Sequence, residues 1–433
     1  MIGIAGVGMS GLAQLLHHRG VKVTGSDSHD GFPTLDAIRA LGISYITPYA
    51  KENVPEGVDM VVYTDAITAD NPERLIARER GIPEYSYFEA LGMISKDAYT
   101  VVVSGTHGKT TTTGMLTKIL VDAGFSPTAI IGSILKDFGS NCVMGEKQLF
   151  IVEGCEWKGH FLHLDADVFV ITNIEFDHSD YFKNLEAVQN LFIQGIQKLP
   201  KHGVVILNTN DLGTKPVIIQ IENQRKKERK GKKIIDYTKT DLLDTPFTGF
   251  NRENAQAATT AAMVCAEYLG RELSIDSVTT SLWKYQGAWR RFEYRGKTKK
   301  GAEVYDDYAH HPTAVKKTIA MARERFPEKN IAVLFHPHLY SRTQSLFHEF
   351  AEALSTADSV YILPIYPARE SAENFPGVNS KALTKAVQDI AGNATYIDTF
   401  EKAERLLEKL DLKYLIITMG AGDVFHVADS LTR

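Results

Sequence analysis

Short runs of apolar residues alternate with longer stretches of mixed apolar and polar residues from the start of the chain. The runs IGIAGVG and VKVTGSD flank the mixed stretch MSGLAQLLHHRG, and DMVVYTDAI precedes NPERLIARERG. We interpret the runs as strands and the mixed stretches as helices; in the last of these, Pro72 near the start and Gly81 after the end are typical helix boundaries. Repeated strand–helix alternation predicts a parallel sheet.

Two further series of the same kind follow. AYTVVVSGTHGKT, FIVEGCE, VFVITNIEFDH and GVVILNTND contain continuous apolar runs, as strands buried on both faces do. After RRFEYRG come AEVYDDYAHHP, NIAVLFHPH, DSVYILPIYP and YLIITMGAGDV, again separated by helical stretches. The pattern predicts an α/β protein of three consecutive domains, at residues 1–96, 97–288 and 289–433.

The composition is typical of a soluble globular protein and argues against one class of binding partner. The 433 residues suit roughly three domains of about 150 residues each, and 44% are hydrophobic and 23% charged. The net charge of −5 argues against a general nucleic-acid binder. The basic stretch IENQRKKERKGKK, residues 221–233, has no interleaved aromatic residues, so we interpret it as a solvated helix or loop.

The cysteines and the N-terminus indicate a cytoplasmic protein. Cys142, Cys155 and Cys265 are widely spaced and odd in number, which suggests a reducing compartment; without a CxxC pair, a structural zinc is not expected. The start MIGIAGVGMSGLAQLL lacks a basic leader, so a signal peptide is the less favoured interpretation. No apolar run reaches the ~20 residues of a membrane helix.

The stretch VVVSGTHGKTTTTGML, residues 101–116, indicates a phosphate-binding turn between a strand and a helix. Gly105 and Gly108 let backbone N–H groups point at phosphate oxygens, and the helix N-terminus adds its dipole. Lys109 would neutralise phosphate charge, and the hydroxyl of Thr110 could ligate Mg²⁺. The alternative is an ordinary turn with a surface lysine. ATP is the expected ligand.

A second glycine-rich turn lies at the start of the chain. Gly3, Gly6 and Gly8 fall between a predicted strand and helix, and Asp27 ends the next strand. This pattern is typical of a nicotinamide-dinucleotide site, and equally of a turn that binds another diphosphate. The motif alone does not decide between them.

Several motifs together resemble the Mur ligases, the ATP-dependent amide-forming enzymes of peptidoglycan synthesis. GTHGKTTTT resembles their nucleotide loop, and GIAGVGMSG, GSD and DNPE resemble a UDP-sugar-binding domain of the family. TNIEFDHSDYF, GAWRRFE, DDYAHHPTAV, HPHLYSRT and GAGDV follow in the family's order. The resemblance covers all three predicted domains.

The resemblance implies a Rossmann-like UDP-sugar-binding domain, a central P-loop ATPase domain with a mostly parallel sheet, and a Rossmann-like C-terminal domain that binds an amino acid. It implies a ligase that uses ATP and Mg²⁺, or Mn²⁺, to join UDP-N-acetylmuramate to L-alanine through an acyl phosphate. A monomer or weak homodimer without nucleic-acid or membrane partners is expected. Three alternatives stay open: a recycling ligase that adds a preformed tripeptide, a catalytically silent UDP-sugar or ATP sensor, and a redox enzyme.

The resemblance also implies roles for residues in the first two domains. The UDP-sugar would contact Gly6, Gly8, Met9, Ser10 and Asp27. Glu153 would join Thr110 on a first magnesium, and His178 would hold a second, although His178 taken alone suits a structural histidine. The implied nucleotide contacts are Gly105, Thr106, Gly108, Lys109, Thr110, Thr111, Asn173, Asn251, Asn254, Arg291 and Asp307. Asn251 is also a candidate helix N-cap, a role compatible with contacting adenine.

In the third domain, charged residues gather at predicted strand ends. Arg290 and Arg291 could form a salt-bridged hinge or reach the γ-phosphate as the domain closes, and we favour the second. His310 would position the amino acid or accept its amine proton, and Arg342 would pair with its carboxylate. The predicted catalytic residues are Lys109, His178, Arg290, His310 and Arg342.

The sequence departs from the family pattern at a few positions. The segment EGCEWKGHF has Cys155, Trp157 and Lys158 where an acidic segment of the form E-A-D-E-S-D is usual, so the geometry of the acceptor site is open. Other departures are Asp65 for serine, Phe250 for histidine and Leu339 for arginine. Phe192 stands where some relatives have a carbamylated lysine, so that modification is not expected.

Overall fold

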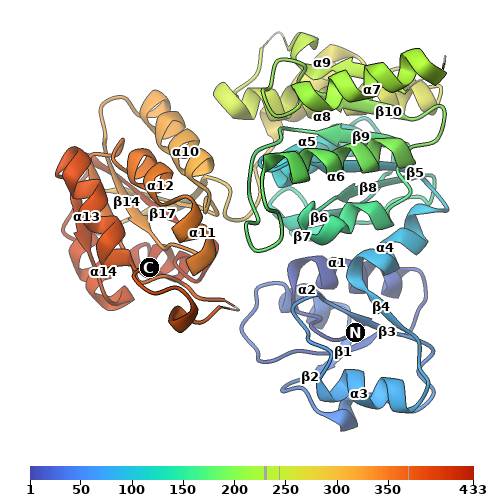
Figure 1. The fold of residues 1–433 in the computed structure, drawn as a ribbon, viewed down its shortest axis with the longest axis horizontal. Helices are drawn as coiled ribbons and strands as arrows, with labels where there is room; N and C mark the ends of the chain where they lie inside the picture. The colour runs from blue at the N-terminus through green and yellow to red at the C-terminus, as the bar shows by residue number, and fades with distance from the viewer. Residues whose placement is uncertain (229–231, 243, 369) are drawn as a thin grey trace. The chain divides into compact units, whose positions relative to one another are not determined.

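The chain forms two compact units. The computed structural model describes residues 1–228, 232–242, 244–368 and 370–433. One unit comprises Met1–Glu175 and Leu185–Ala288, and the other comprises Phe176–Asn184 and Trp289–Arg433. The predicted boundary at residues 288 and 289 falls where the units divide. The predicted boundary at residues 96 and 97 falls inside the first unit, between α4 and β5 (Figure 1).

The N-terminal part of the first unit is built from short parallel strand pairs. β1 pairs with β2 and β3 with β4, and Ile2 bridges Ser26 and Tyr63 between the two pairs. The run IGIAGVG was predicted as a strand, but only Ile2 pairs, because Gly3 (φ +81°) turns the chain into α1. The elements are α1 (Val7–His18), β1 (Thr24–Ser26), α2 (Leu35–Ala40), β2 (Ser44–Ile46), the 3₁₀ turn η1 (Lys51–Asn53), β3 (Val61–Tyr63), α3 (Pro72–Glu79), β4 (Glu84–Ser86) and α4 (Tyr87–Ser95).

A seven-stranded sheet follows, in the order β11-β10-β9-β5-β8-β6-β7. All neighbours are parallel except the β6–β7 pair. The four strands predicted from continuous apolar runs are present, and β6, β7 and β11 were not predicted. The elements are β5 (Tyr99–Ser104), α5 (Lys109–Asp122), β6 (Thr128–Leu135), β7 (Ser140–Val143), β8 (Leu149–Glu153), η2 (Trp157–His163), β9 (Val168–Ile171), α6 (Leu185–Lys198), β10 (Val204–Leu207), α7 (Lys215–Glu228), β11 (Lys233–Asp236), η3 (Tyr237–Lys239), α8 (Gly249–Tyr268) and α9 (Ile275–Lys284).

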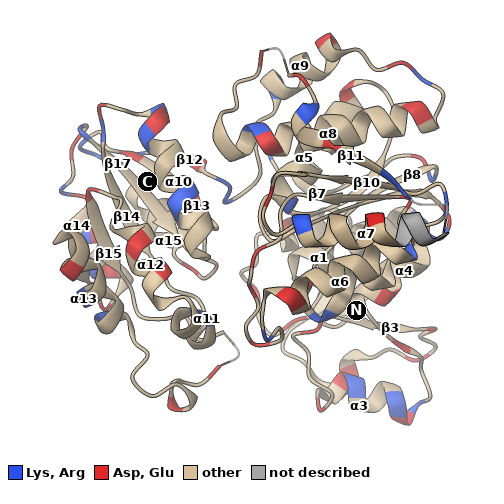
Figure 2. Ribbon diagram, turned by 45° about the horizontal axis from the view of Figure 1, so that its top comes forward, with Lys and Arg blue, Asp and Glu red and all other residues tan. Residues whose placement is uncertain are grey.

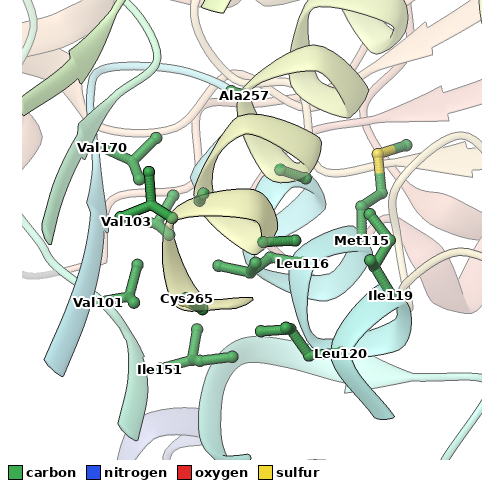
Figure 3. Close-up of a cluster of buried hydrophobic side chains, with 14 of the residues drawn as sticks. Val101, Val103, Met115, Leu116, Ile119, Leu120, Ile151, Val170, Ala257 and Cys265 are labelled. Carbon is green, nitrogen blue, oxygen red and sulfur yellow. The ribbon is translucent and has the colours of Figure 1, made fainter. Parts of the chain in front are cut away.

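The core of this sheet fixes the helix that follows the phosphate turn. Figure 3 shows Leu116 and Leu120 of α5 pointing toward Val101 of β5 and Ile151 of β8, with Cys265 of α8 among them. All five side chains are buried. Burying an aliphatic side chain of this size stabilises the fold by about 1.5–3 kcal/mol. The N-terminus of α5 is therefore held firmly at the carboxyl end of β5.

The other unit contains a six-stranded sheet in the order β12-β13-β17-β14-β15-β16. Only β12 is antiparallel to its neighbour. The four predicted strands are present, and β12 and β16 were not predicted. The elements are β12 (Glu293–Lys297), β13 (Glu303–Asp307), α10 (Pro312–Arg325), β14 (Asn330–Phe335), α11 (Tyr340–Ser345), α12 (Phe347–Leu354), β15 (Ser359–Ile362), η4 (Ala372–Asn374), α13 (Ser380–Ala391), β16 (Ala394–Tyr396), α14 (Phe400–Leu407), β17 (Tyr414–Met419) and α15 (Phe425–Leu431).

Charged residues of both signs occupy the outer helices, as α3 shows in Figure 2. The basic stretch 221–233 runs along α7 as far as Glu228 and then enters residues 229–231, which lie outside the described residues. Within the part of the chain that the structure describes, none of the helices combines the length and apolar character needed to cross a membrane.

Candidate active site

The turn between β5 and α5 has the geometry of a phosphate cradle. Gly105 (φ +125°) and Gly108 (φ +83°) adopt conformations that other residues rarely take. A Cβ atom on Gly105 would lie 2.1 Å from Thr172 Oγ1, and one on Gly108 would lie 2.3 Å from Asn254 Oδ1. Both positions therefore require glycine, for conformation and for space, as expected of a turn whose backbone must face a ligand.

Lys109, the first residue of α5, folds back over this turn. Its Nζ donates to Gly105 O at 2.5 Å and lies 3.0 Å from Glu156 Oε2, a carboxylate that is 2% exposed. Burial alone would lower the pKa of Lys109, but the carboxylates of Glu156 and Glu153 outweigh it and raise the pKa. The lysine therefore stays charged, with its ammonium held beside the turn.

Thr110 and Glu153 form the predicted cation-binding pair. Thr110 Oγ1 donates to Glu153 Oε1 at 3.1 Å, and Gly132 N donates to Glu153 Oε2 at 2.8 Å. A hydroxyl and a carboxylate oxygen so close together suit a hard cation such as Mg²⁺. His178 (φ +54°) belongs to the segment that packs in the other compact unit, so its part in a shared metal site stays a prediction.

The predicted asparagines support the turn. Asn173 Oδ1 accepts from His107 N at 2.9 Å and Asn173 Nδ2 donates to His107 O at 3.0 Å, so this side chain clasps the loop. Asn254 accepts from Thr112 and donates to Asn251. The N-cap prediction for Asn251 is wrong, because α8 begins two residues earlier, at Gly249, with Thr248 as its cap residue.

Two further predicted nucleotide residues lie in the same region. Thr106 exchanges hydrogen bonds with the backbone of Glu175, donating to its oxygen at 3.2 Å and accepting from its nitrogen at 2.8 Å. Thr111 is half-buried in the first turn of α5. Thr106 thus ties the turn to the segment after β9.

The N-terminal glycine turn leads directly into α1, with Gly6 at the cap position. Met9 and Ser10 are buried, and Ser10 Oγ donates to Val7 O at 2.9 Å. Asp27 Oδ2 accepts from Ala5 N at 2.8 Å. The side chains of these three predicted substrate residues therefore support the turn from inside, and the backbone around Gly6 and Gly8 is what can face a diphosphate.

Arg290 is buried in the other unit, with donors on all three guanidinium nitrogens engaged. Nε donates to Asp306 Oδ2 at 2.7 Å, Nη1 to Gly422 O at 2.8 Å and Nη2 to Gly420 O at 2.6 Å. Arg290 is 2% exposed, and Asp306 is fully buried. This geometry favours the salt-bridged alternative for Arg290 over the γ-phosphate contact that the sequence led us to prefer.

Asp307 is likewise engaged by the backbone. It accepts from Ala309 N at 2.8 Å and from Phe292 N at 3.0 Å. Burial raises its pKa to about 6, although nearby Arg291 acts in the opposite direction. Arg291 lies over the ring of Tyr308, 5.0 Å from its centroid. Asp307 and Arg291 therefore lie near each other at the end of β13, and the charge of Arg291 acts on the Asp307 carboxyl group.

His310 and Arg342 meet around a carboxylate in the same unit. Arg342 Nε donates to Asp177 Oδ1 at 3.0 Å and Nη1 lies 3.2 Å from His338 Nδ1. Burial acts to raise the pKa of Asp177, but Arg342 and the surrounding histidines hold it well below its usual range. Asp177 is therefore ionised, and Arg342 is already paired with a carboxylate.

His310 is neutral at physiological pH, as a residue that accepts a proton must be. Burial, with the Arg342 charge close by, holds its pKa well below the usual value. Nδ1 lies 2.8 Å from Tyr308 O, and a carbonyl only accepts, so Nδ1 carries the hydrogen. Nε2 is consequently the nitrogen that can take up a proton.

All three parts of the chain match one protein family. Residues 1–99 match the Mur ligase family catalytic domain, residues 103–262 the Mur ligase middle domain, and residues 290–422 the Mur ligase glutamate ligase domain. The chain belongs to the Mur ligase family. Proteins named UDP-N-acetylmuramate–L-alanine ligase from Lachnospira eligens and Lachnoclostridium phytofermentans are 36% and 35% identical to it, over 100% of this chain and 97% of theirs.

Solved structures of Mur ligases share the fold. The UDP-N-acetylmuramate–alanine ligase of Thermotoga maritima gives a TM-score of 0.78 at 24% identity, and a murein peptide ligase of Psychrobacter arcticus gives 0.69 at 20% identity. Each comparison covers 99% of this chain and 97% of the other. At these identities the likeness establishes the fold alone.

Four residues that contact the predicted site residues were not predicted from the sequence. Glu156 pairs with Lys109, and Asp177 with Arg342. Gly132 leaves room for Glu153, since a Cβ there would lie 2.4 Å from Glu153 Oε2. Tyr87 packs on Gly8, where a Cβ would lie 2.7 Å from its ring. Only Asp177, next to His178 in the motif, carried a signal that could have been followed.

Proposed function

We propose that this chain is an ATP-dependent ligase that forms an amide between the lactyl carboxylate of UDP-N-acetylmuramate and L-alanine. The observation that carries the proposal is the full-length similarity, at 33–36% identity, to curated proteins that share this one name. The glycine cradle, the charged Lys109 and the neutral His310 support it chemically.

The residues around the phosphate cradle suit the activation step. Forming an amide from a carboxylate requires a better leaving group than water, and transfer of the γ-phosphoryl group from ATP to the carboxylate supplies one. Two anions must approach, so positive charge has to be placed around them in advance. Lys109 supplies such a charge, and Thr110 and Glu153 would hold Mg²⁺, which would neutralise phosphate charge when bound.

The cluster around Arg342 suits the amine step. An amine attacks only when deprotonated, and in this proposal His310 Nε2 accepts its proton. Arg342 can bind the carboxylate of the amino acid through a bidentate contact, provided that Asp177 shares or yields its place. Phosphate then leaves as the amide forms. A cytoplasmic location and a monomeric or weakly dimeric state complete the proposal.

The proposal is tested by phosphate release from ATP in the presence of UDP-N-acetylmuramate and either L-alanine or the L-Ala-γ-D-Glu-diaminopimelate tripeptide. We expect release with L-alanine. Release with the tripeptide alone would favour the recycling activity, and release with neither would contradict a ligase of this acceptor. Titration of fluorescence with NADH in the same preparation tests the redox alternative, for which we expect no binding.

A further inference from the structure

The segment after β8, residues 154–165, lies along one face of α4. His160 stacks on Phe88, with ring centroids 4.6 Å apart and an interplanar angle of 18°. One turn further, a Cβ on Gly92 would lie 2.3 Å from His163 O. At the end of the helix, Ser95 Oγ accepts from Asp165 N at 2.9 Å. Positions 88, 92 and 95 share a helix face, so α4 is a continuous platform for this segment.

The same segment begins at the phosphate site. Glu156, whose carboxylate pairs with Lys109, is the residue before η2, and its carbonyl accepts from Gly159 N at 3.0 Å. After Glu156 the chain turns sharply, and Lys158 (φ +51°) and Gly159 (φ +72°) both adopt left-handed conformations. A non-glycine residue in that region is strained unless its surroundings hold it. The position of Glu156 therefore depends on what fixes the far side of the turn.

On its far side, the turn contacts the N-terminal part of the chain through His160 and Asp65. His160 Nε2 lies 3.0 Å from Asp65 Oδ2, and the two side chains are only 9% and 26% exposed. Asp65 follows β3 and stands where serine is common in the family. The pairing lowers the pKa of Asp65, although burial acts against it. Trp157 packs edge-on to the His160 ring at 5.3 Å and closes the cluster.

We infer that Asp65 and His160 are positioning residues that hold Glu156 against Lys109 by locking the turn after β8 onto the N-terminal part of the chain. The inference rests on the proposed function and explains how the unusual segment EGCEWKGHF keeps an ordered site. A single half-buried histidine–carboxylate contact adds little net stability in general, because desolvation offsets the attraction. The pair therefore acts on turnover, by orienting the turn beside the phosphates, more than on folding.

Three variants and one control test this role. Asp65→Asn removes the carboxylate charge. His160→Phe keeps an aromatic ring to stack on Phe88 but removes the ring nitrogens that face Asp65. The double variant combines both changes. The control is His202→Gln, which breaks an exposed His–Asp pair with Asp167 in the same unit. We expect each single variant to lower kcat by about 10- to 100-fold, because catalytic groups would be misplaced. The KM for ATP should change less than about twofold, because the glycine cradle is intact. The double variant should be no worse than either single variant.

A second measurement does not depend on turnover. Hydrogen exchange at the amides of residues 159–161 should become at least tenfold faster in both single variants, with exchange in β8 unchanged. Unchanged exchange there, additive losses in the double variant, or losses equal to those of the control would each overturn the inference. Wild-type protein that releases no phosphate would contradict the proposed function, whereas active wild-type protein with unaffected variants would contradict only the positioning role.

Discussion

Lys109, which is half-buried, and Arg290, which is buried, are two cations that the sequence predicts to be catalytic, and their surroundings differ. Lys109 has one carboxylate partner and otherwise contacts carbonyl groups of the glycine turn. Arg290 donates one hydrogen bond from each guanidinium nitrogen, to Asp306 and to two carbonyls of the loop after β17. An ammonium can exchange one oxygen for another as a phosphate arrives, whereas Arg290 would have to give up its contacts with Asp306 or with backbone carbonyls to turn toward a phosphate. A cationic residue in a motif is thus a good candidate for phosphate binding only where its contacts within the protein can be exchanged for contacts with a ligand.

The largest expected effect is on turnover, at Lys109. Lys109→Ala should lower kcat for phosphate release by at least about 100-fold, because a preorganised charge at the transferring phosphoryl group is lost. The control is Lys118→Ala, a lysine on the same helix that pairs with Asp122, and it should keep near-native turnover. Near-native turnover of Lys109→Ala would contradict the catalytic role by which Lys109 is distinguished from Arg290.

The next effect is on stability, at Arg290. Arg290→Met leaves Asp306 buried without its partner and should lower the free energy of unfolding by about 3–5 kcal/mol, measured by urea denaturation. Arg291→Met is the matched neighbour and should lower turnover with a smaller change in stability. An Arg290→Met variant with native stability and lost turnover would instead support the γ-phosphate contact.

A smaller effect concerns the metal pair. In Gly132→Ala, the new Cβ atom would lie 2.4 Å from the present position of Glu153 Oε2. The carboxylate must therefore move, and its contact with Thr110 is disturbed. We expect the Mg²⁺ concentration that gives half-maximal turnover to rise about tenfold, a typical cost of disturbing a ligand's support. An unchanged Mg²⁺ requirement would show that Glu153 is not a metal ligand.

The smallest effect at neutral pH is expected at His336, which the proposed mechanism does not use. Burial lowers its pKa to about 4 from an ordinary value of 6.5. Between these values the unfolded chain binds a proton that the folded chain does not, so stability falls as the pH drops from 6.5 toward 4. His336→Gln should lose this acid sensitivity, seen as a smaller drop in Tm between pH 7.5 and 5. An unchanged drop would contradict a neutral, buried His336.

The fold was largely predictable because the buried strands are continuous apolar runs, and each of the predicted β5, β8, β9 and β10 is present. β6, β7, β11, β12 and β16 were not predicted. The antiparallel strands β7 and β12 carry short, mixed patterns such as SNCV, but β6 is a buried apolar run that was overlooked. The glycine turn at Gly105 and Gly108 was predictable for a physical reason: both φ angles are positive, and only glycine adopts them freely.

The pairing of charges was not predictable. Lys109 and Glu156 are 47 positions apart, and Arg342 and Asp177 are 165 apart. Such distances in sequence carry no periodic signal, and the partners are set by how the strand ends converge. For the same reason the sequence could not choose between the two roles weighed for Arg290.

The nine residues Phe176–Asn184 have a consequence for how this protein can be divided. They lie in sequence between β9 and α6, yet they pack with the unit that begins at Trp289, where Asp177 pairs with Arg342. A fragment starting at residue 289 would leave that arginine buried without its counter-ion. The C-terminal part is therefore not a module that can be exchanged at a single junction. A chimera that grafts it onto a relative must carry the nine-residue insert as well.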